Sequence, residues 1–200
     1  MSKKEILWRE ILYQATNNKK REFTQKELAE KFGFSLSTVF NSLRELRQLG
    51  IVKVNGRNFL VEDPEKFLYF WATHRKFKAS IAYSTNSSQA VREIEASMPP
   101  SAIFACYSAY RMKYSEPPAD YDKVYVYADA SGLTEIQERF PPKKGYANLV
   151  VLQSDPLLAS YGSMTPDIQT FADIWNLDDW YAKEFSDALK EKIWSFTTAR

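Results

Sequence analysis

The stretch that most constrains this chain lies between Phe23 and Asp63, because its local signals follow one another in a fixed order. Thr24 precedes Glu27 by three residues, the spacing of a capping box, in which each side chain satisfies a free backbone donor. This pair predicts the start of a helix. Gly33 predicts its end in a tight turn, because glycine tolerates the positive φ that such a turn needs.

A second helix is expected directly after this turn. Ser35 or Ser37 caps its N-terminus, since a serine hydroxyl accepts a hydrogen bond from a free backbone N–H. Four apolar residues recur at helical spacing and are expected to face the core. They are Val39, Leu43, Leu46 and Leu49. The residues left to face outward are Ser37, Thr38, Phe40, Asn41, Arg44, Arg47 and Gln48.

A hairpin is predicted after the second helix. Residues Ile51–Val54 have the β-branched content of a strand, and Asn55-Gly56 is a strong signal for a two-residue hairpin turn. Arg57 and Asn58 leave the tip of this hairpin, where they can reach a minor groove or a phosphate. The order of helix, turn, helix and hairpin is that of a winged helix-turn-helix.

This arrangement predicts contacts with double-stranded DNA. In a helix-turn-helix the outward face of the second helix lies in the major groove, its N-terminal residues nearest the base edges. Asn bridges N6 and N7 of adenine and Arg bridges O6 and N7 of guanine, so Asn41 and Arg44 are the expected base readers. The candidate DNA-binding residues are Lys19, Lys20 and Arg21 of a polar loop, Ser37, Thr38, Phe40, Asn41, Arg44 and Arg47 of the helix, and Arg57 and Asn58 of the hairpin.

The pattern ELA-x5-S-x-STV-x3-L-x2-L-x3-GIV, from Glu27 to Val52, resembles the DNA-binding half of winged-helix repressors of the ArsR and MarR type. The resemblance implies a transcriptional repressor. Phe40 departs from the small polar residue usual at its position. Its ring either packs on a thymine methyl group or turns inward. Winged helices also serve as protein-docking modules, so docking of a partner enzyme without DNA is an alternative function.

Charge is distributed unevenly along the chain. The first 78 residues carry 16 Lys and Arg against 9 Asp and Glu, a net of +7, whereas residues 79–200 carry 11 against 16, a net of −5. A basic N-terminal part and an acidic C-terminal part are typical of a DNA-binding domain joined to an effector or partner-binding domain. Cys106 and His74 are the only residues of their types, which excludes an internal disulfide and a metal site built from Cys and His alone.

No membrane helix is expected, because no apolar run approaches about 18 residues. No signal peptide is expected either, because the N-terminus lacks a short apolar core. We therefore expect a cytoplasmic protein of the α+β class, with an N-terminal winged helix-turn-helix followed by a small α+β domain. The expected parts are a DNA-binding domain over 1–63, an aromatic segment over 64–78 and an effector or partner-binding domain over 79–200.

Helices are expected on both sides of the winged-helix pattern. Residues Lys3–Thr16 carry an apolar face that supports the helix-turn-helix from behind. Asp63-Pro64 begins another helix, since Asp caps well and Pro suits the first helical position. Its aromatic residues will not stay exposed. They either dock on the winged helix or form the two-fold interface of a homodimer, which many helix-turn-helix proteins use to read paired half-sites.

From residue 79 onward, short strands alternate with helices. The strands are expected at Ile81–Ser84, Val124–Ala128 and Leu149–Leu152. The helices are expected from a cap at Ser87 or Ser88 to Met98, within Ile103–Tyr114, over Leu133–Phe140, from Pro166 to Leu177, and from a cap at Asp178 to Trp194.

The second half also resembles a known family. Its motifs are Cys106-Tyr107-Ser108-Ala109 at a helix start, a strand like Val124–Ala128, the run Ala147–Leu152 before Asp155, and Thr165–Ile174 followed by a helix rich in Ala and Glu. Their order is similar to the C-terminal half of AbiEi-type antitoxins, the transcriptional-regulator partners in type IV toxin-antitoxin systems. The resemblance implies promoter autoregulation and a nucleotidyltransferase-like toxin as protein partner.

An enzyme is not expected, and neither is a bound cofactor or metal. The chain has no phosphate-cradling glycine loop of either common spacing. Its one histidine and one cysteine lie far apart, which gives little basis for a nucleophilic site. Asp120, Asp122 and Asp129 flank the Val124–Ala128 strand and in principle could hold Mg²⁺, so a metal-dependent nucleotidyl-transferring enzyme is a second alternative. Solvation of the strand ends is the competing interpretation.

Overall fold

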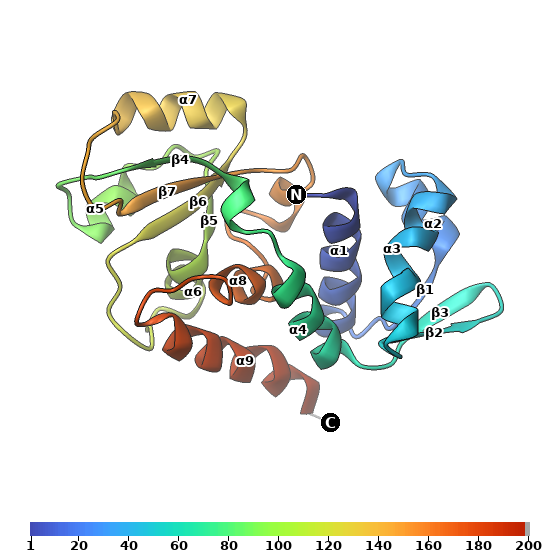
Figure 1. The fold of residues 1–200 in the computed structure, drawn as a ribbon. Helices are drawn as coiled ribbons and strands as arrows, with labels where there is room; N and C mark the ends of the chain where they lie inside the picture. The colour runs from blue at the N-terminus through green and yellow to red at the C-terminus, as the bar shows by residue number, and fades with distance from the viewer. Residues whose placement is uncertain (199–200) are drawn as a thin grey trace. The chain divides into compact units, whose positions relative to one another are not determined.

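The computed structural model describes residues 1–198, with side chains through Ser195, and Figure 1 shows its fold. The chain divides into two compact units. The N-terminal unit consists of Ser2–Arg75 and the chain from Glu191 onward, and the C-terminal unit consists of Lys76–Lys190 with Met1. The mixed α and β content confirms the predicted α+β class.

The N-terminal unit has the element order of a winged helix-turn-helix. Its three strands form an antiparallel sheet of order β1-β3-β2. The elements are α1 (Lys3–Asn17), β1 (Glu22–Thr24), α2 (Gln25–Phe32), α3 (Leu36–Gln48), β2 (Val52–Asn55), β3 (Asn58–Val61) and α4 (Pro64–His74).

The turn between α2 and α3 forms as the sequence predicts. The Thr24 hydroxyl accepts from the Glu27 backbone N–H at 3.0 Å, and Gly33 ends α2 with a φ of 62°. Only half of the predicted capping box is present, because the Glu27 carboxylate pairs instead with Lys20 at 2.9 Å. Of the two candidate caps for α3, Ser35 is the one used.

The prediction that Leu49 faces the core is wrong. Val39, Leu43 and Leu46 are fully buried, but Leu49 is 42% exposed. Leu49 is the C-terminal cap of α3, after which Gly50 turns the chain with a φ of 68°. Helical spacing therefore no longer applies at this position.

The hairpin forms one residue later than predicted. Asn55 pairs with Asn58, so the turn residues are Gly56 and Arg57 rather than Asn55 and Gly56. Gly56 has a φ of 61° and Arg57 does not have a positive φ, as in a type II′ turn. Strand β1 was not predicted. It is three residues long and pairs Glu22–Thr24 with the distant strand β3.

The aromatic helix α4 packs on α1 within the N-terminal unit. The ring of Trp8 lies 6.1 Å from that of Phe67 and 5.3 Å from that of Phe70, both edge to face. The Trp8 indole N–H also donates to the Ser42 carbonyl of α3 at 2.9 Å. The segment therefore docks on the winged helix, which is one of its two predicted arrangements.

The C-terminal unit contains a four-stranded sheet of order β4-β7-β6-β5, in which only β6 and β7 are parallel. Its strands are β4 (Ile81–Thr85), β5 (Ile103–Ala105), β6 (Val124–Ala128) and β7 (Leu149–Gln153). Its helices are α5 (Val91–Ala96), α6 (Cys106–Tyr114), α7 (Ala130–Arg139) and α8 (Asp167–Ile174), with short 3₁₀ turns η1 (Lys78–Ser80) and η2 (Leu158–Tyr161). Helix α9 (Ala182–Thr198) belongs to this unit through Lys190.

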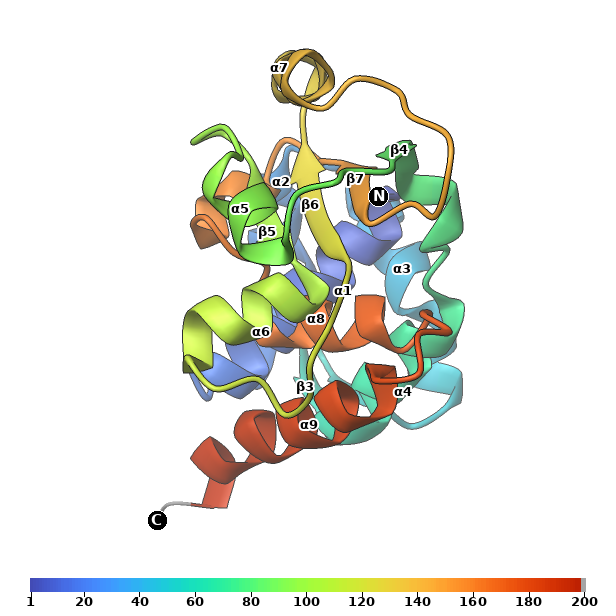
Figure 2. The same ribbon diagram turned by 90° about the vertical axis from the view of Figure 1, so that its left-hand side faces the viewer.

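Helices cover both faces of this sheet. Val124, Val126 and Val151 of β6 and β7 pack with Ile94 of α5 and Ile136 of α7 in one apolar core. Figures 1 and 2 show α5 and α7 on this side of the sheet, and α6 and α8 on the other. Every residue of β6 is buried, as expected for a strand covered on both faces.

Three boundary predictions in this unit are wrong. The expected cap at Ser87 or Ser88 is replaced by Ala90, and α5 begins at Val91. Helix α7 begins at Ala130, after its cap Asp129, rather than at Leu133. Helix α6 starts at Cys106 as the Cys106–Ala109 motif indicates, although strand β5 before it was not predicted. The last helix begins at Ala182 rather than after Asp178.

Candidate nucleic-acid interface

Helix α3 is fixed by its ends and by its buried side. The Ser35 hydroxyl accepts from the Thr38 backbone N–H at 3.2 Å and so caps the first turn. Lys4 of α1 pairs with Glu45 of α3 at 2.8 Å, and the hydrogen bond from Lys4 lowers the pKa of the Glu45 carboxyl. Val39, Leu43 and Leu46 fix one side of α3 in the core, so the opposite side of the helix forms a defined outer face.

The outer face of α3 exposes hydrogen-bonding side chains that the fold does not use. Asn41, Arg44 and Gln48 are exposed, and within residues 1–198 none of them forms a side-chain hydrogen bond or ion pair. Ser37 and Thr38 instead bond to the Ser35 hydroxyl, each at 2.9 Å. The polar groups available to an external ligand are therefore the amides of Asn41 and Gln48 and the guanidinium of Arg44.

Phe40 and Arg47 form a pair at the side of this face. Phe40 is 46% exposed, so its ring does not turn into the core. The Arg47 guanidinium lies 4.1 Å above the ring, and its Nη2 donates to the Phe40 carbonyl at 2.8 Å. Arg47 is only half exposed and, unlike Arg44, is already bound within the fold.

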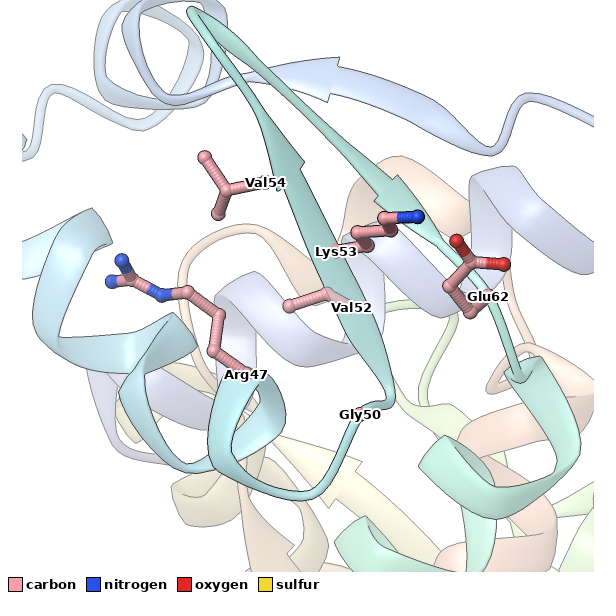
Figure 3. A pocket seen from close by; sticks show the side chains of 6 residues that line it. All are labelled: Arg47, Gly50, Val52, Lys53, Val54 and Glu62. Atoms are coloured by element: carbon pink, nitrogen blue, oxygen red, sulfur yellow. The ribbon is translucent and has the colours of Figure 1, made fainter.

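A hollow of about 590 Å³ lies beside the C-terminal end of α3 and strand β2 (Figure 3). It is lined by Arg47, Gly50, Val52, Lys53, Val54 and Glu62. Val52 and Val54 point from β2 toward the side of Arg47, whereas Lys53 and Glu62 lie on the other side of the strand. Sequence reasoning missed Lys53, an exposed cation of the wing. Alternation of side chains along β2 could have revealed it, because Val52 is buried and Lys53 therefore points the other way.

The candidate phosphate-binding cations belong to two segments that the small sheet brings together. The Val61 N–H of β3 donates to the Arg21 carbonyl at 2.9 Å, which joins the loop of Lys19, Lys20 and Arg21 to the wing. Lys19 and Arg21 are exposed, as is Arg57 at the hairpin tip. The others already have partners, since Lys20 pairs with Glu27 and the Asn58 amide donates to Glu22 at 2.8 Å.

The aspartates considered for Mg²⁺ lie at opposite ends of β6, and two of them, Asp122 and Asp129, have structural partners. Asp122, before the strand, accepts from the Tyr181 hydroxyl at 2.6 Å. Asp129, after the strand, accepts from the Gly132 N–H at 2.8 Å and caps α7. Asp120 is exposed. Among residues 1–198 no three His, Cys, Asp or Glu side chains are placed to hold a metal ion.

The tyrosines of the C-terminal unit surround a buried carboxylate that the sequence does not reveal. Asp179 accepts from the hydroxyl groups of Tyr107 at 2.9 Å and Tyr125 at 3.2 Å, and it pairs with Lys123. Burial raises the pKa of both tyrosine hydroxyls, so they remain neutral donors. The cluster binds the segment before α9 to α6 and β6.

In the part of the chain that the structure describes, no helix combines the length and the apolar character needed to cross a membrane.

Comparison with known proteins supports the interpretation of the N-terminal unit. Residues 7–69 match the family of Crp-like helix-turn-helix domains, a span that runs from α1 to α4. The chain matches no curated protein and no solved structure. The resemblance of the second half to AbiEi-type antitoxins is not confirmed by these comparisons. The family match and the element order together support an N-terminal helix-turn-helix DNA-binding domain.

Proposed function

We propose that this protein is a sequence-specific DNA-binding transcriptional regulator that acts as a repressor. The observation that carries the proposal is the outer face of α3, where Asn41 and Arg44 are exposed and bound to nothing else in residues 1–198. Unpaired amide and guanidinium groups on the second helix of a helix-turn-helix are suited to adenine and guanine edges in the major groove.

Binding would use two kinds of contact, to the bases and to the phosphates of the DNA. Arg44 and Asn41 read bases, whereas Lys19, Arg21 and Arg57 neutralise phosphates on either side of the groove. The phosphate contacts carry affinity for any duplex and make binding depend on salt. Lys20 joins them only if it leaves Glu27, its partner at 2.9 Å.

We further propose that the protein binds as a homodimer in the cytoplasm, with one helix α3 in each of two half-sites about one DNA turn apart. A dimer covering a promoter in this way would exclude RNA polymerase. The resemblance of residues 100–190 to AbiEi-type antitoxins supports a promoter of its own operon as the target, and a toxin as the partner of the acidic C-terminal unit. A toxin-like reading frame beside the gene would support this role.

The experiment is a selection of duplexes from a random pool by the full-length protein. The expected result is enrichment of one motif in two inverted copies, with an adenine or a guanine among its invariant bases. An Asn41→Ala, Arg44→Ala double variant should enrich no motif while retaining weak binding to the pool. Failure of the wild-type protein to enrich any motif would contradict the proposal.

A second candidate function is docking of a protein partner on the same surface. The observation in its favour is apolar exposure on α3 and the wing, where Leu36 is 56%, Phe40 46% and Val54 40% exposed. Under this function the selection yields no motif. Substituting Leu36 and Phe40 by serine would then abolish capture of the partner, while the DNA-binding variants would leave capture unchanged.

We also propose a non-enzymatic role for the C-terminal unit. Support comes from the positions of Asp122 and Asp129, which serve as a tyrosine partner and a helix cap. Equilibrium binding of Mg²⁺ with a nucleoside triphosphate tests this proposal. Nucleotide-dependent Mg²⁺ binding that Asp122→Asn abolishes would contradict it.

A further inference from the structure

One exposed aromatic residue lies in a row of side chains that approaches the predicted DNA site. Leu36, Phe40, Arg44 and Gln48 follow one another at intervals of four along α3, so they form one continuous line on the helix surface. The first two are apolar and exposed, whereas the last two are polar and exposed. Phe40 is therefore the neighbour of the predicted guanine reader, one helical turn away.

The fold holds the Phe40 ring in place on this surface. Arg47 covers one face of the ring at 4.1 Å, and its Nη2 donates to the Phe40 carbonyl at 2.8 Å. The Nε atom of Arg47 is buried, so part of this guanidinium is out of reach of a ligand. These contacts occupy Arg47 and restrict the rotation of Phe40, although Phe40 as a residue remains 46% exposed.

The major groove contains one apolar group suited to such a ring, the C5 methyl of thymine. A phenyl ring cannot donate or accept the hydrogen bonds that identify the other bases. We infer that Phe40, held in place by Arg47, contacts the C5 methyl of a thymine next to the base pair that Arg44 reads. Arg47 is thus a positioning residue and not a base reader. This inference rests on the proposed function, because it requires α3 to lie in the major groove.

The test replaces thymine by uracil in the duplex selected above, one position at a time. Uracil lacks the methyl group but keeps the O4 acceptor and the pairing with adenine. At the thymine beside the Arg44 base pair, wild-type affinity should fall about fourfold, the change expected for exposing one buried methyl or methylene group. Phe40→Ala should bind the thymine and uracil duplexes equally, and other thymines should show no difference in either protein.

Two variants separate positioning from folding. Arg47→Ala should reduce the thymine-to-uracil affinity ratio toward one, because the ring loses its support. Arg92→Ala, which removes an exposed arginine of α5 outside the helix-turn-helix, should keep the wild-type ratio. A wild-type ratio in Arg47→Ala would overturn the positioning role. That ratio is not changed by a loss of folded protein, since both duplexes are measured with the same sample.

The outcomes distinguish this inference from the proposed function. Suppose that the wild-type protein selects a motif but binds the thymine and uracil duplexes equally at every position. The inferred contact between Phe40 and a thymine methyl group is then wrong, whereas the proposed function as a sequence-specific regulator is still supported. Persistence of the ratio in Phe40→Ala would assign the methyl contact to another residue and also overturn the inference. If the wild-type protein selects no motif at all, the proposed function is contradicted, and the inference that rests on it is contradicted with it.

Discussion

Replacing Arg44 by alanine should weaken binding to the selected site and relax specificity at one base pair. A bidentate arginine–guanine contact contributes about 1 to 3 kcal/mol of discrimination, or about 5- to 150-fold in affinity. Arg44 is exposed and has no hydrogen bond or ion pair within residues 1–198. The substitution should therefore change the free energy of unfolding by less than about 0.5 kcal/mol. The loss of DNA affinity in Arg44→Ala would therefore come from the missing base contact and not from a loss of folded protein.

Arg57→Ala is the matched comparison, because Arg57 is an equally exposed arginine at the hairpin tip. It should weaken selected and random duplexes alike and reduce the salt slope of log affinity by about 0.9, the value for one phosphate contact. Fluorescence anisotropy with the selected duplex, its single-base variants and a random duplex measures both effects. Equal losses on selected and random DNA for both variants would refute this division between base and phosphate contacts.

Three further predictions concern stability. Ser35→Ala should cost about 1 kcal/mol in denaturant unfolding because α3 loses its cap, and an unchanged midpoint would contradict that role. Asp179→Ala should cost about 3 kcal/mol because Lys123 loses its buried partner, whereas Asp178→Ala, an exposed neighbour, should cost less than about 0.5 kcal/mol. Burial raises the pKa of Tyr121 to about 12, so its contribution to stability is complete below pH about 10, the unfolded value, and is lost as the pH rises toward 12. Unfolding free energies across this range should fall less steeply in Tyr121→Phe, and an identical fall would contradict the assignment.

The helix-turn-helix could be predicted because its signals are local. A cap, a glycine and a helical apolar spacing each act within a few residues, so Gly33, Val39 and a serine cap place the start of α3 to within two residues, at Ser35 or Ser37. Leu49 was predicted wrongly because it continues this spacing in the sequence after the helix has ended. Periodicity alone does not show where the last turn stops.

Features that depend on distant residues could not be predicted. Strand β1 is too short to have a pattern of its own and exists through its pairing with β3, 36 residues away by the Phe23–Phe59 register. The Asp179 carboxylate pairs with Lys123 and accepts from Tyr107, which lie far back in the sequence. No local spacing links such partners.

The orientation of Phe40 illustrates the same limit in the candidate site. Helical periodicity places it near the boundary between the buried and exposed sides of α3, where either orientation is possible. In the structure Phe40 is exposed and contacts Arg47, two turns later in the helix. The sequence therefore predicted a set of candidate residues on the outer face of α3, but not which of their polar groups the fold already uses.

The most direct test of sequence-specific DNA binding is a salt titration of affinity for the DNA upstream of the gene, beside a scrambled duplex of equal length. The proposal predicts steep salt dependence on both duplexes and a preference of about 10³ or more for the upstream DNA. Weak binding that is equal on the two duplexes, at every salt concentration, would contradict a sequence-specific regulator and would identify the exposed face of α3 as a protein-docking surface.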